Sequence, residues 1–212
     1  MPERSPLLAT VAVAALGLLL TGCGGTEQEA AAPPTKATPA TPTPTTPAVA
    51  AAGGSLGGPG TACSLPVSFS FAEDWKPKAV SPPADPDFAE LLRQGPATVV
   101  CEVNAKGAGH IGFLRVWTAP KGPAKATLTA FVKAEKGSKG LALTDTTAGG
   151  LPVVEARYSV HVELLDEDKE KRSFAVETAK GTVVVELGGL DPEEHRAMIP
   201  AYELAKSTLK LS

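Results

Sequence analysis

The stretch that decides the fold is RSFAVETAKGTVVVEL at 172–187, in which two strand-like runs, Arg172 to Thr178 and Thr182 to Leu187, follow each other closely. Both runs are rich in apolar residues that favour strands, and they mostly alternate between apolar and polar positions. A third run of the same kind, Pro152 to Leu164, precedes them. Because consecutive strands with short connections usually pair, these runs predict an antiparallel meander.

Four more strands are predicted on the N-terminal side of this meander. They share apolar, β-branched or alternating patterns: Val67 to Phe71, Ala97 to Val103, Ile111 to Thr118 and Leu141 to Thr147. The second and third lie on either side of the glycine-rich sequence NAKGAG at 104–109, which predicts a hairpin. A G-x-G-x-x-G match at 107–112 overlaps this loop. A dinucleotide motif must open a helix, so a hairpin loop is the preferred interpretation.

Three segments have helical patterns: Asp85 to Leu92, Pro123 to Lys136 and Asp191 to Leu209. Each has a proline at or near its start, where the missing N–H costs no helical hydrogen bond. Pro200 predicts a kink or a break in the last helix. The expected fold class is therefore α+β, with an antiparallel sheet of about six to seven strands and helices packed on it.

The first 61 residues differ in composition from the rest of the chain. Arg4 and the apolar run from Leu7 to Leu20 are typical of a signal peptide, because the run is too short for a permanent membrane span. Residues 24–61 are mainly Ala, Pro, Thr and Gly, which predicts a disordered tether with a reach on the order of 100 Å. The predicted organisation is a signal peptide (1–22), a lipidated cysteine with its tether (23–61) and a globular α+β domain (62–212).

The sequence Leu20-Thr21-Gly22-Cys23 directly follows the apolar run. It resembles the lipobox of bacterial lipoprotein precursors. The resemblance implies that Cys23 receives a diacylglyceryl thioether and becomes the N-terminus after cleavage. Two acyl chains give stable anchoring where one does not, so the resemblance implies a lipid-anchored protein on the extracytoplasmic face of the cell membrane. The alternative is an ordinary secreted protein with a chance cysteine after its signal peptide.

Two cysteines, Cys63 and Cys101, remain once Cys23 is assigned to lipid. In an oxidising compartment such a pair is expected to form a disulfide. This bond would join the N-terminal end of the domain to a predicted core strand. The alternative is a pair of reduced, buried thiols.

The order of the predicted elements resembles a known fold family. The strand Val67 to Phe71 is followed by Asp74-Trp75, a helix, a hairpin, a second helix, the meander and a C-terminal helix ending near Leu209. This order is similar to the Mog1/PsbP-like fold and, among lipoproteins, to the LpqN/LpqT group, over about Ser64 to Leu211. The resemblance implies a domain that binds other proteins or small ligands, and it brings no catalytic residues with it.

Charge and motif content exclude several function classes. The net charge is −3 and no stretch forms a concentrated basic face, so a nucleic acid partner is not expected. His110, His161 and His195 have no metal-ligand spacing, and no cofactor is expected. The G-x-S-x-G match at 53–57 lies in the predicted tether, where no strand-to-helix turn would expose a serine nucleophile.

Trp75, Trp117 and Arg115 are the candidate contact residues for a partner or ligand, since aromatic residues and arginines often anchor binding. The alternative for Trp75 is a place in the core, and Trp117 and Arg115 could form a stacked pair on one strand face. The mixed-charge run at 166–172 is interpreted as a solvated hairpin turn, or otherwise as a docking loop for a charged partner.

Three functions stay open on the sequence. The leading hypothesis is a non-enzymatic domain that binds an envelope protein or an apolar, lipid-like envelope ligand while a diacylglyceryl anchor holds it at the membrane. The second is a cell-wall-directed hydrolase, for which Glu155, Asp145 or His161 would have to converge in a cleft. The third is a structural or assembly factor of the envelope.

Overall fold

The computed structural model describes residues 48–83 and 85–212. The predicted signal peptide, Cys23 and the first part of the predicted tether lie outside the described residues. Within the described ranges, no helix is both long enough and apolar enough to cross a membrane.

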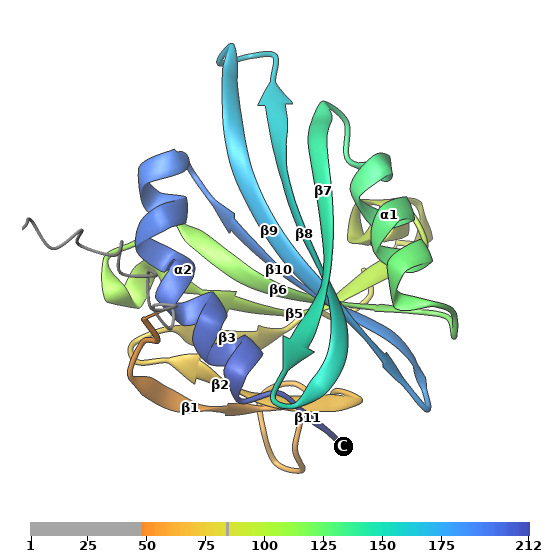
Figure 1. The fold of residues 1–212 in the computed structure, drawn as a ribbon, viewed down its shortest axis with the longest axis vertical. Helices are drawn as coiled ribbons and strands as arrows, with labels where there is room; N and C mark the ends of the chain where they lie inside the picture. Colours follow the sequence, from red (N-terminus) through yellow and green to blue (C-terminus); the bar gives the residue numbers. More distant parts are fainter. Residues whose placement is uncertain (1–47, 84) are drawn as a thin grey trace, which may run out of the picture. The chain divides into compact units, whose positions relative to one another are not determined.

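A large, mostly meandering antiparallel sheet forms the centre of the domain (Figure 1). Its strands run in the order β3 (Lys76–Ala79), β5 (Ala97–Asn104), β6 (Gly112–Ala119), β10 (Gly181–Gly189), β9 (Glu167–Thr178), β8 (Leu151–Val162) and β7 (Ser138–Ala148), and β4 (Arg93–Gln94) also pairs with β5. The predicted meander is confirmed, because β9 pairs with β8 on one side and with β10 on the other. The expected α+β class is also confirmed, although this sheet has eight strands rather than six to seven.

A second, smaller sheet consists of β1 (Ala52–Leu56), β2 (Val67–Ala72) and β11 (Lys210–Leu211). Strand β1 lies inside the segment predicted to be a disordered tether, yet it pairs antiparallel with β2 and buries Leu56 completely. This part of the prediction is therefore corrected: the folded region begins before Ala62. The G-x-S-x-G match at 53–57 accordingly lies on and just after an edge strand.

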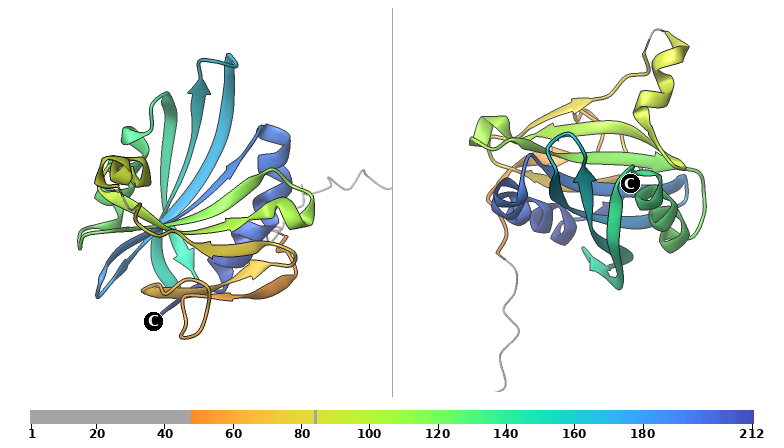
Figure 2. Two further views of the ribbon diagram at one scale, coloured as in Figure 1. Left: turned by 180° about the vertical axis from the view of Figure 1, so that it is seen from behind. Right: turned by 90° about the horizontal axis from the view of Figure 1, so that it is seen from above.

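Two α-helices cover opposite faces of the large sheet (Figures 1 and 2). Helix α1 (Ala124–Ala134) lies over one face and α2 (Pro192–Ser207) over the other. The Asp191 side chain caps α2 by accepting a hydrogen bond from the backbone N–H of Glu194, as its sequence indicates. Of the two outcomes predicted at Pro200, a kink or a break, the break is wrong, since α2 runs through that residue as one helix.

Among the described residues there are also two short 3₁₀ helices, η1 (Pro86–Leu92) and η2 (Ala105–Ala108). The second lies in the predicted hairpin between β5 and β6. It ends at Gly109, whose backbone has φ 84°, a conformation that glycine adopts without steric cost. The chain then continues into β6 and not into a helix, which confirms that the glycine-rich match at 107–112 is a hairpin loop.

Alternation along the strands divides the core into two apolar clusters. On β10, Val183, Val185 and Leu187 face the cluster beneath α2, whereas Val184 faces the cluster beneath α1. Successive side chains of a strand point to opposite faces, so a strand buried on both sides reads as a continuous apolar run. Glu186, on the α1 side, interrupts that run.

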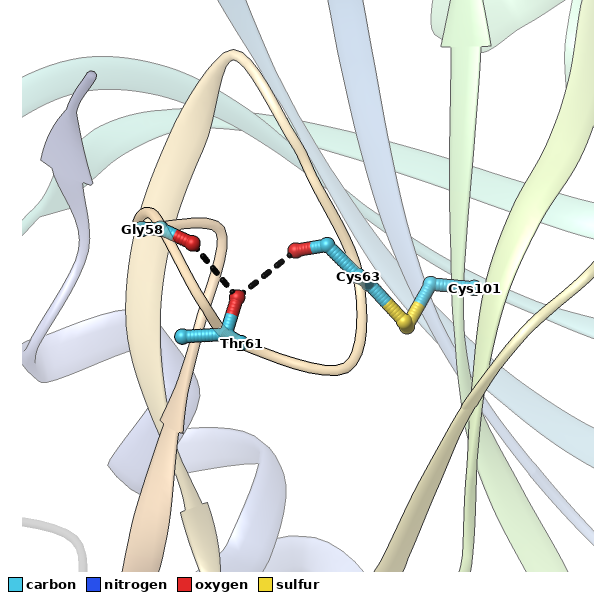
Figure 3. The surroundings of a disulfide bond; sticks show 4 residues. All are labelled: Gly58, Thr61, Cys63 and Cys101. Atoms are coloured by element: carbon cyan, nitrogen blue, oxygen red, sulfur yellow. Dashed lines mark hydrogen bonds between the residues drawn. A yellow bond between two sulfur atoms is a disulfide. The ribbon is translucent and has the colours of Figure 1, made fainter.

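The predicted disulfide between Cys63 and Cys101 is formed, with 6.0 Å between the two Cα atoms (Figure 3). Cys101 lies on β5, and Cys63 follows the loop after β1. The Thr61 hydroxyl lies 2.8 Å from the Gly58 carbonyl oxygen and 2.9 Å from that of Cys63, and it holds this loop together. The disulfide thus ties the N-terminal part of the domain to the large sheet.

Candidate functional site

The two tryptophans predicted as possible contact residues are both buried. Trp75 is 3% exposed in the cluster beneath α2, and Trp117 is 6% exposed beneath α1, where it packs edge-on against Phe131. Both positions favour the core role over a role at a binding surface. Arg115 does share a face with Trp117, but its guanidinium lies 4.9 Å from the centre of the Phe113 ring and pairs with Glu102 at 2.9 Å.

Arg115 lines an open cleft of about 320 Å³ on the face of the sheet that α1 covers in part. We call this the α1-side cleft. Its apolar lining comes from Ile111, Phe113, Val160, Val162 and Leu190. Its ionisable lining comes from Arg115, Glu135, Lys169, Lys171 and Glu186.

Strand register explains why the cleft lies here. Phe113, Gly188, Lys171 and Tyr158 form a row across β6, β10, β9 and β8, because each is directly paired with the next. Gly188 contributes no side chain to this row. A Cβ atom at that position would lie 3.3 Å from the Lys171 ammonium nitrogen, so the glycine leaves room for the lysine side chain to lie over β10.

The length of α1 sets the other boundary of the cleft. The helix ends at Ala134, and its C-cap residue Glu135 reaches down to the sheet. The Glu135 carboxylate contacts the Lys171 ammonium at 3.2 Å and accepts a hydrogen bond from the Tyr158 hydroxyl at 3.0 Å. Beyond Glu135 the helix no longer covers the sheet, and the cleft begins there.

Lys171 is the centre of a buried cluster on the floor of the cleft. Its ammonium lies 3.2 Å from carboxylate oxygens of both Glu135 and Glu186, and only 14% of its side chain is exposed. The Tyr158 hydroxyl also lies 2.9 Å from a Glu186 carboxylate oxygen, so its single proton is shared between the two carboxylates. Two carboxylates are therefore held by one ammonium and one hydroxyl, a pattern that satisfies charges which burial would otherwise make costly.

The electrostatics fix the protonation of this cluster. Burial lowers the pKa of the Lys171 ammonium, but the carboxylates of Glu186 and Glu135 outweigh it, so the pKa lies above its ordinary value and the amine stays charged. Burial, and then the same two carboxylates, raise the pKa of Tyr158 above its ordinary value. The phenol therefore keeps its proton and remains a hydrogen-bond donor.

A second ion-pair cluster lies on the opposite face, under α2. Arg172, the neighbour of Lys171 in sequence, contacts Glu203 at 3.2 Å, and Lys206 contacts Glu155 at 2.7 Å. The Tyr202 hydroxyl donates to Glu155 at 3.2 Å. Since Glu203, Lys206 and Tyr202 all belong to α2, this cluster fastens the helix to the sheet.

His195, in the first part of α2, is buried as a neutral side chain. It is 2% exposed, and its Nδ1 atom has no hydrogen-bond partner among the described residues. Burial, together with the positive charges of Arg172, Lys171 and Arg196, lowers the pKa of His195 to about 4. The imidazole is thus uncharged near neutral pH.

The residues required by the hydrolase hypothesis do not converge. Glu155 is under α2, Asp145 pairs with Lys125 at an exposed site on β7, and His161 lies beside Asp168 near the tip of the β8–β9 hairpin. Within the described parts of the chain, no group of three or more His, Cys, Asp or Glu side chains is placed to hold a metal ion.

The interpretation of the charged run at 166–172 as a solvated hairpin turn is wrong for most of its residues. Strand β9 begins at Glu167, so most of the run is strand rather than turn. Lys171 and Arg172 then point to opposite faces and become the centres of the two buried clusters. A sequence signal existed in Glu155 and Glu186, which are carboxylates inside otherwise apolar strands and require buried partners.

Comparison with known proteins identifies related sequences and folds. A family described as "Uncharacterised lipoprotein" matches residues 32–209. No curated protein matches the chain.

The chain is also similar to solved structures, among them the following two. The solution structure of cyanobacterial PsbP (CyanoP) from Synechocystis sp. PCC 6803 is 15% identical, with a TM-score of 0.48 over 75% of this chain and 98% of that one. The crystal structure of LpqN, "involved in cell envelope biogenesis of Mycobacterium tuberculosis", is 16% identical, with a TM-score of 0.40 over 73% of this chain and 87% of that one.

Proposed function

This chain belongs to that family of lipoproteins, and on this premise we propose that it is a membrane-anchored extracytoplasmic protein whose domain binds an apolar group of an envelope ligand or protein partner in the α1-side cleft. Cys23 would carry the lipid. The 24 residues at 24–47 would then separate the anchor from the domain by at most on the order of 80 Å, the fully extended length of such a chain.

The observation that carries this proposal is the composition of the cleft. Small-molecule sites are concave, mostly apolar and supplied with a few fixed polar groups. Here Ile111 and Leu190 are large apolar residues left 58% and 46% exposed at the cleft, and Phe113 and Val162 extend the same surface inward. The Lys171 cluster supplies the fixed polar groups on the floor.

The arrangement favours binding over catalysis, even though two carboxylates share the floor. General acid–base catalysis needs a group that can exchange a proton with a bound substrate. Glu186 is 2% exposed, and both it and Glu135 are already engaged by Lys171 and Tyr158. These carboxylates are positioned to hold the ammonium and the helix end in place.

Titration with the uncharged fluorescent probe N-phenyl-1-naphthylamine tests the proposal. The purified domain should bind it saturably, and Gly188→Val should weaken binding about tenfold or more, because three added carbon atoms would occupy the floor. Thr144→Leu is the matched control, since it adds apolar surface on the exposed part of β7, away from the cleft. Failure of the wild-type domain to bind, or equal affinity in Gly188→Val, would overturn the proposal.

The anchor is tested separately. In the producing bacterium, Cys23→Ala should release the protein from the membrane fraction and abolish incorporation of labelled fatty acid. A variant that stays acylated would refute the assignment of lipid to this residue.

A further inference from the structure

The charged atoms that a ligand can reach in the α1-side cleft are mainly cationic. Three of the five ionisable lining residues, Arg115, Lys169 and Lys171, carry positive charge. The Arg115 side chain is 39% exposed, whereas the carboxylate of Glu186 is covered. A ligand entering the cleft therefore meets Arg115 before the covered carboxylate of Glu186, whereas Glu135 is 19% exposed and Lys171 14%.

Lys169 differs from the other two cations because no ion-pair partner for it is found within residues 48–83 and 85–212. Arg115 pairs with Glu102, and Lys171 pairs with Glu135 and Glu186. Among the described residues, Lys169 has no carboxylate within ion-pair distance, although it is half-buried in the cleft wall. A half-buried ammonium without a counterion favours the binding of an anion, which would supply the missing charge.

The Lys171 ammonium has hydrogen-bonding capacity left as well. An ammonium has three N–H donors, and two of them are directed to Glu135 and Glu186. Lys171 lines the cleft with 14% of its side chain exposed, so the ammonium can be reached from the cleft. An acceptor oxygen bound in the cleft could take the third hydrogen bond.

Apolar side chains directly adjoin these cations. Val160 is the direct cross-strand partner of Lys169, and Val162 is the next residue of β8 on the same face. Leu190 and Ile111 continue the apolar surface across the cleft, joined by a 2.9 Å backbone hydrogen bond. A volume of about 320 Å³ is at the small end for a ligand pocket, and it suits one apolar chain better than two.

We propose that the α1-side cleft takes a single-chain amphiphile with one anionic head, a carboxylate or a phosphate, and that Lys169 determines the preference for the negative charge. This proposal rests on the proposed function, because it specifies the occupant of the same cleft. The head lies between the ammonium groups of Lys169 and Lys171, which both line the cleft. The alkyl chain lies on Val160, Val162, Leu190 and Ile111.

Displacement of N-phenyl-1-naphthylamine by amphiphiles of equal chain length tests it. Octanoate and octyl phosphate should each displace the probe at about fivefold lower concentration than octan-1-ol, since one partly exposed ion pair contributes on this scale. Octyltrimethylammonium should be weaker than octan-1-ol. The two anions distinguish a carboxylate head from a phosphate head, and a preference for either one supports the proposal.

Lys169→Gln keeps the polarity and approximate size of the side chain but removes its charge. It should abolish the preference for anions, measured within this variant as the ratio of the concentrations of octanoate and octan-1-ol that displace the probe. Lys180→Gln is the matched control, because Lys180 is exposed in the β9–β10 turn outside the cleft. Loss of the preference in the control as well would overturn the role of Lys169.

The remaining outcomes separate this proposal from the proposed function. Probe binding with equal displacement by octanoate, octyl phosphate and octan-1-ol would overturn the anionic head and leave the apolar cleft intact. Preference for octyltrimethylammonium would overturn it too and would point to Glu135 as the recognising group. Absence of probe binding would overturn the proposed function itself.

Discussion

Acidification should destabilise the domain through His195. The folded protein holds the pKa of this side chain at about 4, against an ordinary value of 6.5, so the unfolded chain binds the proton first as the pH falls. Stability is therefore full above the unfolded pKa and is lost between the two values. Linkage gives a loss of about 2 kcal/mol between about pH 7 and about pH 5, and a limit of about 3 kcal/mol at lower pH.

Urea unfolding at the two pH values measures this loss, with fluorescence of the buried Trp75 and Trp117 as the signal. In His195→Leu, the difference in unfolding free energy between the two pH values should shrink by about 2 kcal/mol, whatever the substitution does to stability at neutral pH. His161→Gln is the control, because this histidine lies near the exposed hairpin tip and is not part of the α2 interface. Equal losses in wild type and His195→Leu would refute the reasoning.

Three further predictions concern stability, measured by urea unfolding at neutral pH. Lys171→Met should cost about 3–5 kcal/mol, because it leaves two buried carboxylates without their cation; a loss below about 1 kcal/mol would contradict the role given to this ammonium. Replacing Cys63 and Cys101 by alanine should lower the free energy of unfolding by about 4 kcal/mol in the chain-entropy model. A reductant should cause the same loss in the wild type and no further loss in the alanine variant. A domain starting at Ala62 should be less stable than one starting at residue 48 by about 2 kcal/mol or more, since it lacks β1 and the buried Leu56; equal stability would restore the tether boundary inferred from the sequence.

The sequence predicts the large sheet well because its strands carry their own signal. The run 183–185 is apolar on both faces, as a central strand covered by two helices must be, and the flanking strands alternate. Strand β1 has no such signal. Its sequence AGGSL holds one large apolar residue, and the strand forms because β2 offers it a paired edge. The conformation of β1 is therefore decided by its pairing with β2 and not by a pattern in its own sequence.

The candidate site was harder to predict for a related reason. Carboxylates inside apolar strands, such as Glu186, show that a buried cation is needed, but they do not say where in the chain it lies. The cation lies in a run of charges that reads as a solvated turn. Only the register of β9 against β8 and β10 places Lys171 opposite Tyr158 and Gly188.

The two faces of β9 differ in how far a helix covers them, and this difference explains why one of the two ion-pair clusters borders a binding site. Lys171 and Arg172 are neighbours in sequence, and each holds one helix to the sheet through buried carboxylates. Helix α2 has 16 residues and lies across its cluster, supplying the partners Tyr202, Glu203 and Lys206 from its own surface. Helix α1 has 11 residues and ends one position before Glu135, so its cluster lies at the helix end, with the rest of the row uncovered. Beyond the end of this shorter helix lies the cleft lined by Arg115, Lys169 and Lys171, and that cleft is what makes the α1 face suited to bind a ligand.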